Sequence, residues 1–133
     1  MAENHTKGVR TSEQRRAAKA FELVQTVGPA DKANYGLFSH KLPILIRTCG
    51  LVSALVFVQV KGKRGGRLLL DHLAEQLKEA RLLRTGSEAA LLEAARQAAL
   101  PDYMRLTREL LAVLNWHKRL SVSILDVHQG EGD

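Results

Sequence analysis

The sequence predicts an all-α protein, a compact bundle of about five or six helices, on three observations. Leucine and alanine together number 38 among the 133 residues, whereas valine and isoleucine number 13, and the first pair favours helices. Only three prolines interrupt the chain. Hydrophobic residues make up 45% of it, which is enough for one core. A length of 133 residues predicts a single domain and excludes a multidomain enzyme.

Capping signals and apolar spacing predict the first two helices. Thr11 and Gln14, three residues apart, fit a capping box. The apolar residues that follow recur at helical spacing and predict a helix over 11–27. A second helix is predicted over 31–48, and Pro43 must either kink it or start a new turn.

The middle of the chain holds an apolar segment followed by a basic one. Residues 51–60 are apolar on every side, so periodicity alone does not separate a buried helix from a buried strand. We assign a helix, because a lone strand would have no strand to pair with. Residues 61–67, Lys-Gly-Lys-Arg-Gly-Gly-Arg, contain no apolar side chain and are predicted to form a flexible basic loop.

Three further helices complete the predicted bundle. A leucine-rich stripe predicts a helix over 69–83. Thr85 and Glu88 form a second capping box, which predicts a helix that Pro101 ends. The last helix is predicted over 102–123, with one apolar face. Its opposite face carries four polar side chains: Arg105, Arg108, Asn115 and Arg119.

The polar ends of the sequence set the predicted domain boundaries. We expect a flexible N-terminal tail over 1–10, a single α-helical domain over 11–125 and an acidic C-terminal tail over 126–133. The first residues lack the apolar core of a signal peptide. The longest apolar run, 51–60, is far shorter than the ~20 residues that span a bilayer. The sequence therefore predicts a soluble, cytoplasmic protein.

The charge balance favours an anionic partner. Twenty lysines and arginines against 14 acidic residues give a formal net charge of +6 and a pI near 9.8. The positive excess lies in the first third of the chain, in the loop at 61–67 and in the last helix. A protein with this balance associates preferentially with polyanions, so nucleic acid is the first class of partner to consider.

Known cofactor and metal motifs are absent from the sequence. Cys49 is the only cysteine, and no two histidines have the i, i+4 spacing of a helical metal pair. The glycine-rich segment 61–67 lacks the Gly-Lys-Ser/Thr ending of a phosphate-binding loop. We therefore expect no catalytic group, no metal and no cofactor.

One spacing supports an alternative function. Arg67, followed by Asp71 and His72, resembles the Arg-to-His motif of helical HEPN ribonucleases, although Leu68 stands where that family usually has a polar residue. Five positions along one regular helix place Arg67 and His72 roughly 140° apart, so a bend or a second subunit would have to join them. A helix-turn-helix DNA binder is a weaker third hypothesis, because no short turn leads into a polar recognition helix.

Several stretches occur together in a specific order. They are Tyr35-Gly36, Lys41-Leu42-Pro43 with Leu45-Ile46-Arg47, Gly50-Leu51, Ala54-Leu55-Val56-Phe57, the Leu69-Leu70 to His72-Leu73 block, Thr107 to Glu109, and Asn115-Trp116 with Lys118-Arg119. From about Arg15 to Leu120 this pattern resembles the small α-helical subunit of the type III-B CRISPR effector, the Cmr complex. Cys49 and His117 depart from it, since that family often has asparagine and an apolar residue there.

The resemblance implies a non-catalytic subunit that stacks in a few copies along the middle of a ribonucleoprotein, while other subunits cleave RNA. The implied partners are other Cmr subunits, copies of the chain itself, and the guide RNA with its paired target, without a membrane. Backbone contacts would be electrostatic and indifferent to base sequence. The candidate RNA-binding cations, expected on one contiguous strip, are Arg15, Arg16, Lys19, Lys41, Arg47, Lys61, Lys63, Arg64, Arg67, Arg105, Arg108 and Arg119.

Overall fold

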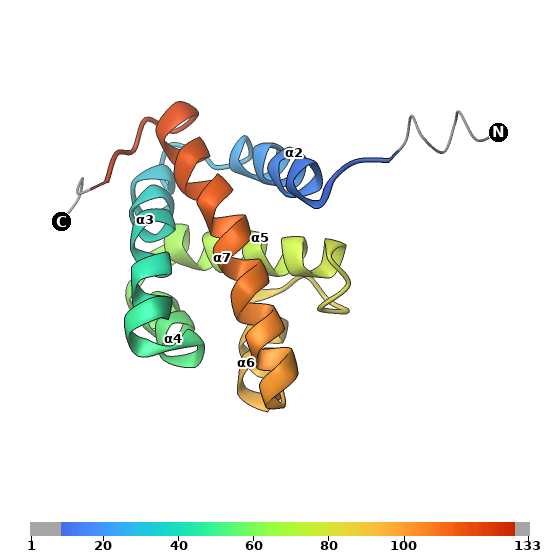
Figure 1. Cartoon of the computed structure of the whole chain (residues 1–133). Coiled ribbons are helices and arrows are strands. Elements are labelled where there is room, and N and C mark those ends of the chain that lie inside the picture. The colour runs from blue at the N-terminus through green and yellow to red at the C-terminus, as the bar shows by residue number, and fades with distance from the viewer. Residues whose placement is uncertain (1–8, 130–133) are drawn as a thin grey trace.

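The computed structural model describes residues 9–129. Within that range the chain forms six α-helices and no strand (Figure 1), which confirms the predicted fold class. The helices are α2 (Ser12–Val24), α3 (Lys32–Cys49), α4 (Leu51–Lys61), α5 (Lys63–Glu79), α6 (Glu88–Gln97) and α7 (Leu100–Ser123). None of them is both long and apolar enough to cross a membrane.

Helix α5 is the central element of the bundle. It contacts each of the other five helices, and Figure 1 shows α7, the longest helix, crossing it. Leu69, Leu73 and Leu77 of α5 are fully buried, as are Leu110 and Leu114 of α7. Because α7 turns this apolar side toward α5, its opposite side faces outward.

The prediction of a flexible basic loop at 61–67 is wrong, because the segment is helical. Lys61 ends α4, and α5 begins at Lys63 after a single glycine, Gly62. A Cβ atom on Gly65 would lie 2.5 Å from the Asp31 carbonyl oxygen and 2.8 Å from the Tyr35 nitrogen. The glycine therefore allows α5 to pass directly against the start of α3, and its role is close packing rather than flexibility.

Two other uncertain features of the sequence are resolved as helix. Helix α3 continues through Pro43, which is buried, without a new start. The apolar segment after Gly50 forms α4, as predicted. Gly50 has φ +88°, a left-handed value that glycine adopts without strain. The Leu51 N–H then donates to the Tyr103 hydroxyl at 3.0 Å, which fixes the start of α4 against α7.

The boundaries around α6 differ from the prediction. Helix α5 ends at Glu79 rather than Leu83, because Arg81 takes a left-handed conformation (φ 65°). The Leu82 N–H donates to the Leu77 carbonyl at 2.8 Å, a Schellman motif without its usual glycine. The capping box predicted from Thr85 is also wrong, because Ser87 accepts the Ala90 N–H and caps α6.

The last helix is longer than predicted, and the packed chain extends past it. Helix α6 already ends at Gln97, and Pro101 lies in the first turn of α7 instead of terminating its predecessor. Beyond α7, Val127 is buried and packs against Gly36 of α3. Ordered packing thus reaches two residues beyond the predicted boundary at 125, whereas 130–133 and 1–8 lie outside the described residues.

Candidate nucleic-acid interface

The structure divides the predicted cations between two main surfaces. One group lies on the outward side of α7. There Arg105, Arg108 and Arg119 share a strip with Asn115, opposite the buried leucines. The other lies at the corner where α4 meets α5 and contains four side chains: Lys61, Lys63, Arg64 and Arg67. Residues of the two groups line different hollows of the surface. Lys41 lies half-buried on α3.

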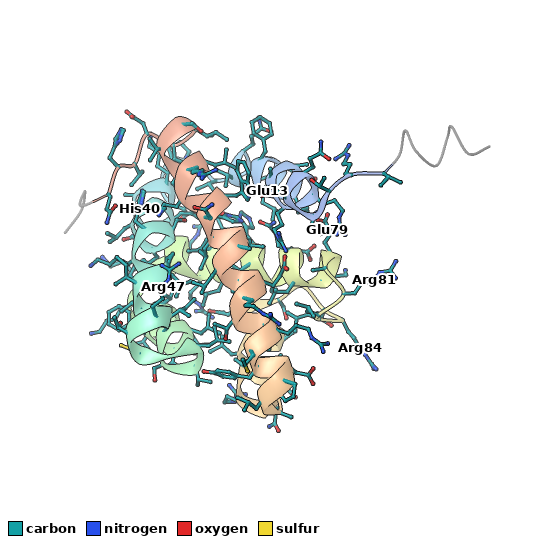
Figure 2. The ribbon with its side chains drawn as sticks, viewed as in Figure 1. Glu13, His40, Arg47, Glu79, Arg81 and Arg84 are labelled. Carbon is teal, nitrogen blue, oxygen red and sulfur yellow. The ribbon has the colours of Figure 1, made fainter. Side chains whose placement is uncertain are left out.

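A groove between α3 and α7 brings together the best-placed polar groups. We call it the α3–α7 groove; it is lined by Pro43, Arg47, Leu111, Ala112, Asn115 and Lys118. Arg47 lies on the side of the molecule where α7 crosses the bundle (Figure 2). Within residues 9–129, neither Arg47 nor Lys118 has a carboxylate at ion-pair distance. Their charges are therefore available to an anionic ligand.

The remaining cations of the α7 strip are exposed and lie along the same helix as the groove. Arg119 lies over the Trp116 ring, 5.1 Å from its centroid, which holds the guanidinium near the surface by a cation–π contact. Arg105 is 3.8 Å from Asp102, a solvent-exposed pair of small strength. Arg108 is exposed and has no ion pair within the described chain.

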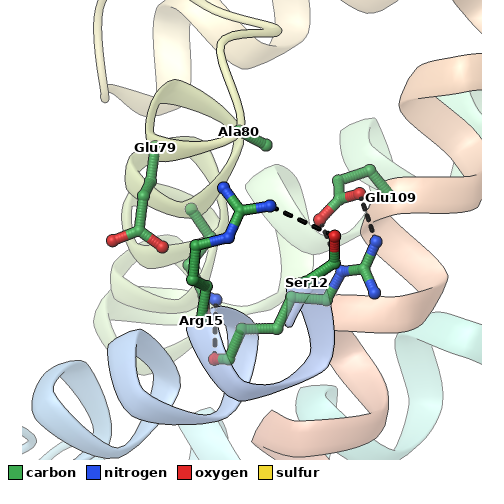
Figure 3. Close-up of a pocket in the computed structure, with 7 residues that line it drawn as sticks. Ser12, Arg15, Glu79, Ala80 and Glu109 are labelled. Atoms are coloured by element: carbon green, nitrogen blue, oxygen red, sulfur yellow. Dashed lines mark hydrogen bonds and ion pairs between the residues drawn. The ribbon is translucent and has the colours of Figure 1, made fainter. Parts of the chain in front are cut away.

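The cations of α2 are more strongly engaged by the protein itself. Arg16 donates two hydrogen bonds to Glu109 of α7, at 2.8 and 2.9 Å. This bidentate contact raises the pKa of Arg16 above its ordinary value. Figure 3 shows the pocket around this pair, where Arg15 reaches Ser12 at 3.1 Å. Lys19 lies 3.6 Å from Glu22. Arg16 thus joins α2 to α7.

At the corner of α4 and α5, acidic residues of other segments neutralise the arginines. Arg67 donates to both carboxylate oxygens of Glu88, at 3.0 to 3.2 Å, and this raises its pKa. Arg64 lies 3.4 Å from Asp31. The Glu88 N–H in turn donates to Asp71 at 2.8 Å, so this network fixes the start of α6 on α5. Lys61 and Lys63 are exposed at the corner.

The same contacts do not favour the ribonuclease alternative. Arg67 is bound to Glu88, and His72 is buried, with its Nδ1 atom 2.7 Å from the Tyr35 hydroxyl. The two side chains stand on one continuous helix, α5, whose geometry turns them apart. Within residues 9–129, no three histidine, cysteine or acidic side chains are grouped so that they could hold a metal ion.

His72 belongs to a buried chain of hydrogen bonds that joins four helices. The Gln76 amide donates to the Arg16 carbonyl at 3.2 Å, so its oxygen accepts from the His117 Nε2–H. Because its lowered pKa keeps His117 neutral, the Nδ1 atom of this ring accepts from the Tyr35 hydroxyl, at 2.8 Å. Since a hydroxyl has one proton to donate, His72 donates its Nδ1–H to Tyr35. Both histidines are neutral in this arrangement.

The electrostatics of this polar cluster agree with neutral histidines. Burial, with a smaller effect of the neighbouring His72, lowers the pKa of His117 to about 3. Burial, with a smaller effect of Lys19, lowers the pKa of His72 to about 4. Burial also raises the pKa of Tyr35 well above its usual value. The cluster therefore serves the fold, and the prediction that His117 is a hydrogen-bonded core residue is confirmed.

Sequence reasoning missed two parts of the basic surface. Lys118 lines the α3–α7 groove, but its helical position lies at the flank of α7, and only the packing of α3 shows that this flank meets Arg47. Arg81 and Arg84 project from the connection between α5 and α6 (Figure 2). Arg81 shares a hollow with Arg105. Its left-handed backbone has no glycine or asparagine to signal it.

Comparison with known proteins assigns the family. The model of the family described as CRISPR-associated protein (Cas_Cmr5) matches residues 12–124. The CRISPR system Cmr subunit Cmr5 of Thermus thermophilus is 38% identical over 119 residues, covering 89% of this chain and 99% of that protein. The crystal structure of a CRISPR-associated Cmr5 family protein from the same organism matches with a TM-score of 0.76 and 38% identity, covering 86% and 98% of the two chains. These matches confirm the resemblance found in the sequence, and the chain belongs to the Cmr5 family of CRISPR-associated proteins.

Proposed function

We propose that this chain is a non-catalytic, RNA-binding small subunit of a cytoplasmic type III-B CRISPR (Cmr) ribonucleoprotein that acts in antiviral RNA-targeting defence. In the proposed assembly, copies of the chain stack beside other Cmr subunits along the guide RNA and its paired target. Family membership supports the assembly, because the T. thermophilus relative bears the name of a Cmr subunit. The basic surface of the chain supports RNA as a binding partner.

The unpaired cations of the α3–α7 groove carry this proposal. Arg47 and Lys118 come from two helices, lack carboxylate partners within the described chain and flank the Asn115 amide. Such a group can bind phosphate oxygens by two charge-assisted contacts and one neutral hydrogen bond. Arg108 and Arg119 extend the positive surface along the same helix.

The proposed mechanism is electrostatic support of an A-form duplex. Cations spaced along a rigid helix can follow a phosphate backbone, whereas the guide supplies base recognition by pairing. The aromatic side chains with a polar edge are engaged within the protein: Tyr35 is buried in the polar cluster, the Tyr103 hydroxyl accepts the Leu51 N–H, and the Trp116 ring is covered by Arg119. Binding should therefore be insensitive to base sequence and sensitive to salt.

A salt titration with two matched double variants tests this function. The complex is assembled from the Cmr proteins and a guide RNA, with either Arg47→Ala/Lys118→Ala or Arg64→Ala/Arg67→Ala, and target RNA affinity is measured from low to high salt. Each lost phosphate contact should reduce the slope of log affinity against log salt by about 1. We expect a reduction of about 2 for the groove variant and no change for the other. Equal slopes for both variants and the unmodified complex would refute RNA binding by the groove.

A further inference from the structure

Helix α4 carries two complete helix-packing stripes, and only one of them is covered. Leu51, Ala54, Leu55 and Val58 occupy the spacing i, i+3, i+4, i+7 and are buried in the bundle. Ser53, Val56, Phe57 and Val60 repeat that spacing on the outward side. Of these, Val56, Phe57 and Val60 are 39%, 43% and 68% exposed. We call the second set the outer α4 stripe.

An outward stripe of this kind is unusual for a surface helix. A surface helix normally has one apolar face and one charged face, whereas a helix that is apolar on every side is normally buried. The only charged residue of α4 is Lys61 at its end. Elsewhere in the described chain, exposed large apolar residues are isolated or paired, as with Phe21 on α2 or Leu100 and Met104 on α7. The outer α4 stripe thus has the pattern of a helix-docking surface.

The charge around the stripe defines its partner. Between Asp31 and Asp71 the sequence contains no acidic residue, but it contains seven cations: Lys32, Lys41, Arg47, Lys61, Lys63, Arg64 and Arg67. Lys61 and Lys63 are exposed at the C-terminal end of the stripe, without an ion pair within residues 9–129. A complementary ligand has apolar side chains for the stripe and carboxylates for these lysines.

We infer that the outer α4 stripe docks an acidic amphipathic helix of a different protein subunit. Two copies of α4 facing each other would bring together two helices whose only charged residue is Lys61, with no carboxylate on either helix to pair with it, which is repulsive. RNA offers phosphates to the lysines but gains nothing from the aliphatic side chains of Val56 and Val60. An amphipathic helix satisfies both the apolar and the charged part of the surface.

This inference rests on the proposed function, since the partner is sought among the protein subunits of the same effector. The test uses the full chain and the other Cmr proteins, co-purified after nuclease digestion so that no RNA holds them together. Val56→Gln/Val60→Gln replaces apolar anchors by good helix formers, and Phe21→Gln is the matched control at an exposed apolar residue on another helix. Thermal melting of each isolated variant checks folding, and sedimentation of the isolated chain checks self-association.

We expect Val56→Gln/Val60→Gln to weaken binding to the other Cmr proteins at least tenfold, while Phe21→Gln binds as the unmodified chain does. Lys61→Glu/Lys63→Glu should weaken binding more than Lys61→Ala/Lys63→Ala, because the partner is acidic. Unchanged protein binding by the α4 variant would overturn the inference. So would a loss confined to RNA binding, or a loss of self-association in the isolated chain. A failure of the groove to bind RNA would appear only in the salt titration, so the two proposals fail separately.

Discussion

The start of α5 and the α3–α7 groove contain the same kinds of side chain but serve different purposes. At the start of α5, Arg64 and Arg67 meet Asp31 and Glu88, which come from other parts of the chain. In the groove, Arg47 and Lys118 meet no carboxylate of the described chain. The comparison shows that the position of a cation in the sequence does not decide its role. Its role depends on whether the fold brings a carboxylate to it.

The two regions also differ in how tightly the backbone is packed. Gly65 places α5 against α3 with no room for a methyl group, whereas the groove is an open hollow between two helices. Substitutions near α5 should therefore change stability, and substitutions in the groove should change ligand binding.

Acid should destabilise the fold through the buried histidines of α5 and α7 without changing the groove. The folded pKa values of His72 and His117, about 4 and about 3, lie below the ordinary value of 6.5. The unfolded chain therefore binds more protons below pH 6.5. Stability is complete above that pH and is lost as pH falls toward 4, by up to about 1.4 kcal/mol per pH unit for each histidine. At pH 5 the combined loss is about 4 kcal/mol.

Urea unfolding at pH 7.5 and pH 5 measures this loss. His72→Gln should remove about half of the difference between the two pH values, because one titrating group remains. Phe21→Gln, at an exposed residue of α2 without a titratable group, should leave the difference intact. The groove contains no histidine, so RNA binding per folded molecule should stay constant. Equal stability at both pH values would show that the buried histidines are not held neutral.

Gly65→Ala should destabilise the chain by about 3 kcal/mol. The new methyl group would meet the backbone of α3 at 2.5 to 2.8 Å, and a backbone cannot move aside as a flexible side chain can. Gly28→Ala is the control, because its methyl group would meet nothing within 4 Å. Thermal melting compares the two variants. A stable Gly65→Ala protein would indicate that the segment is a loop, as the sequence alone had suggested.

Arg16→Ala should cost about 1 kcal/mol of stability, because it removes a bidentate, partly buried contact with Glu109. Arg47→Ala, which removes an equal charge but no ion pair, should change stability by less than about 0.5 kcal/mol. Chemical unfolding measures both. In the assembled complex we expect the opposite order for RNA affinity. If Arg16→Ala weakened RNA binding as much as Arg47→Ala, the division between paired and unpaired cations would be wrong.

Local signals were enough to predict most of the fold. The capping box of Thr11 and Gln14 is present, and α3, α4 and α7 lie close to their predicted ranges. The failures occur where distant residues decide the structure. Residues 61–67 look flexible until α3 packs against Gly65.

The boundaries of the helices near α6, and the candidate site, also depend on residues that are distant in the sequence. Arg81 adopts a conformation that its residue type does not signal, and Glu88 is engaged by Arg67 instead of completing a capping box. For the site, the sequence predicted the α7 strip, since helical periodicity fixes it. It could not separate paired from unpaired arginines or place Lys118 beside Arg47, because both depend on tertiary contacts.

Lysine footprinting tests the central claim most directly, namely that the unpaired cations of the α3–α7 groove lie on RNA. The assembled complex is acetylated with its RNA in place and again after nuclease digestion of that RNA, and modification is read at Lys118 and at Lys78, an exposed lysine of α5. We predict that RNA protects Lys118 severalfold and leaves Lys78 unaffected. Equal acetylation of Lys118 with and without RNA would contradict this assignment.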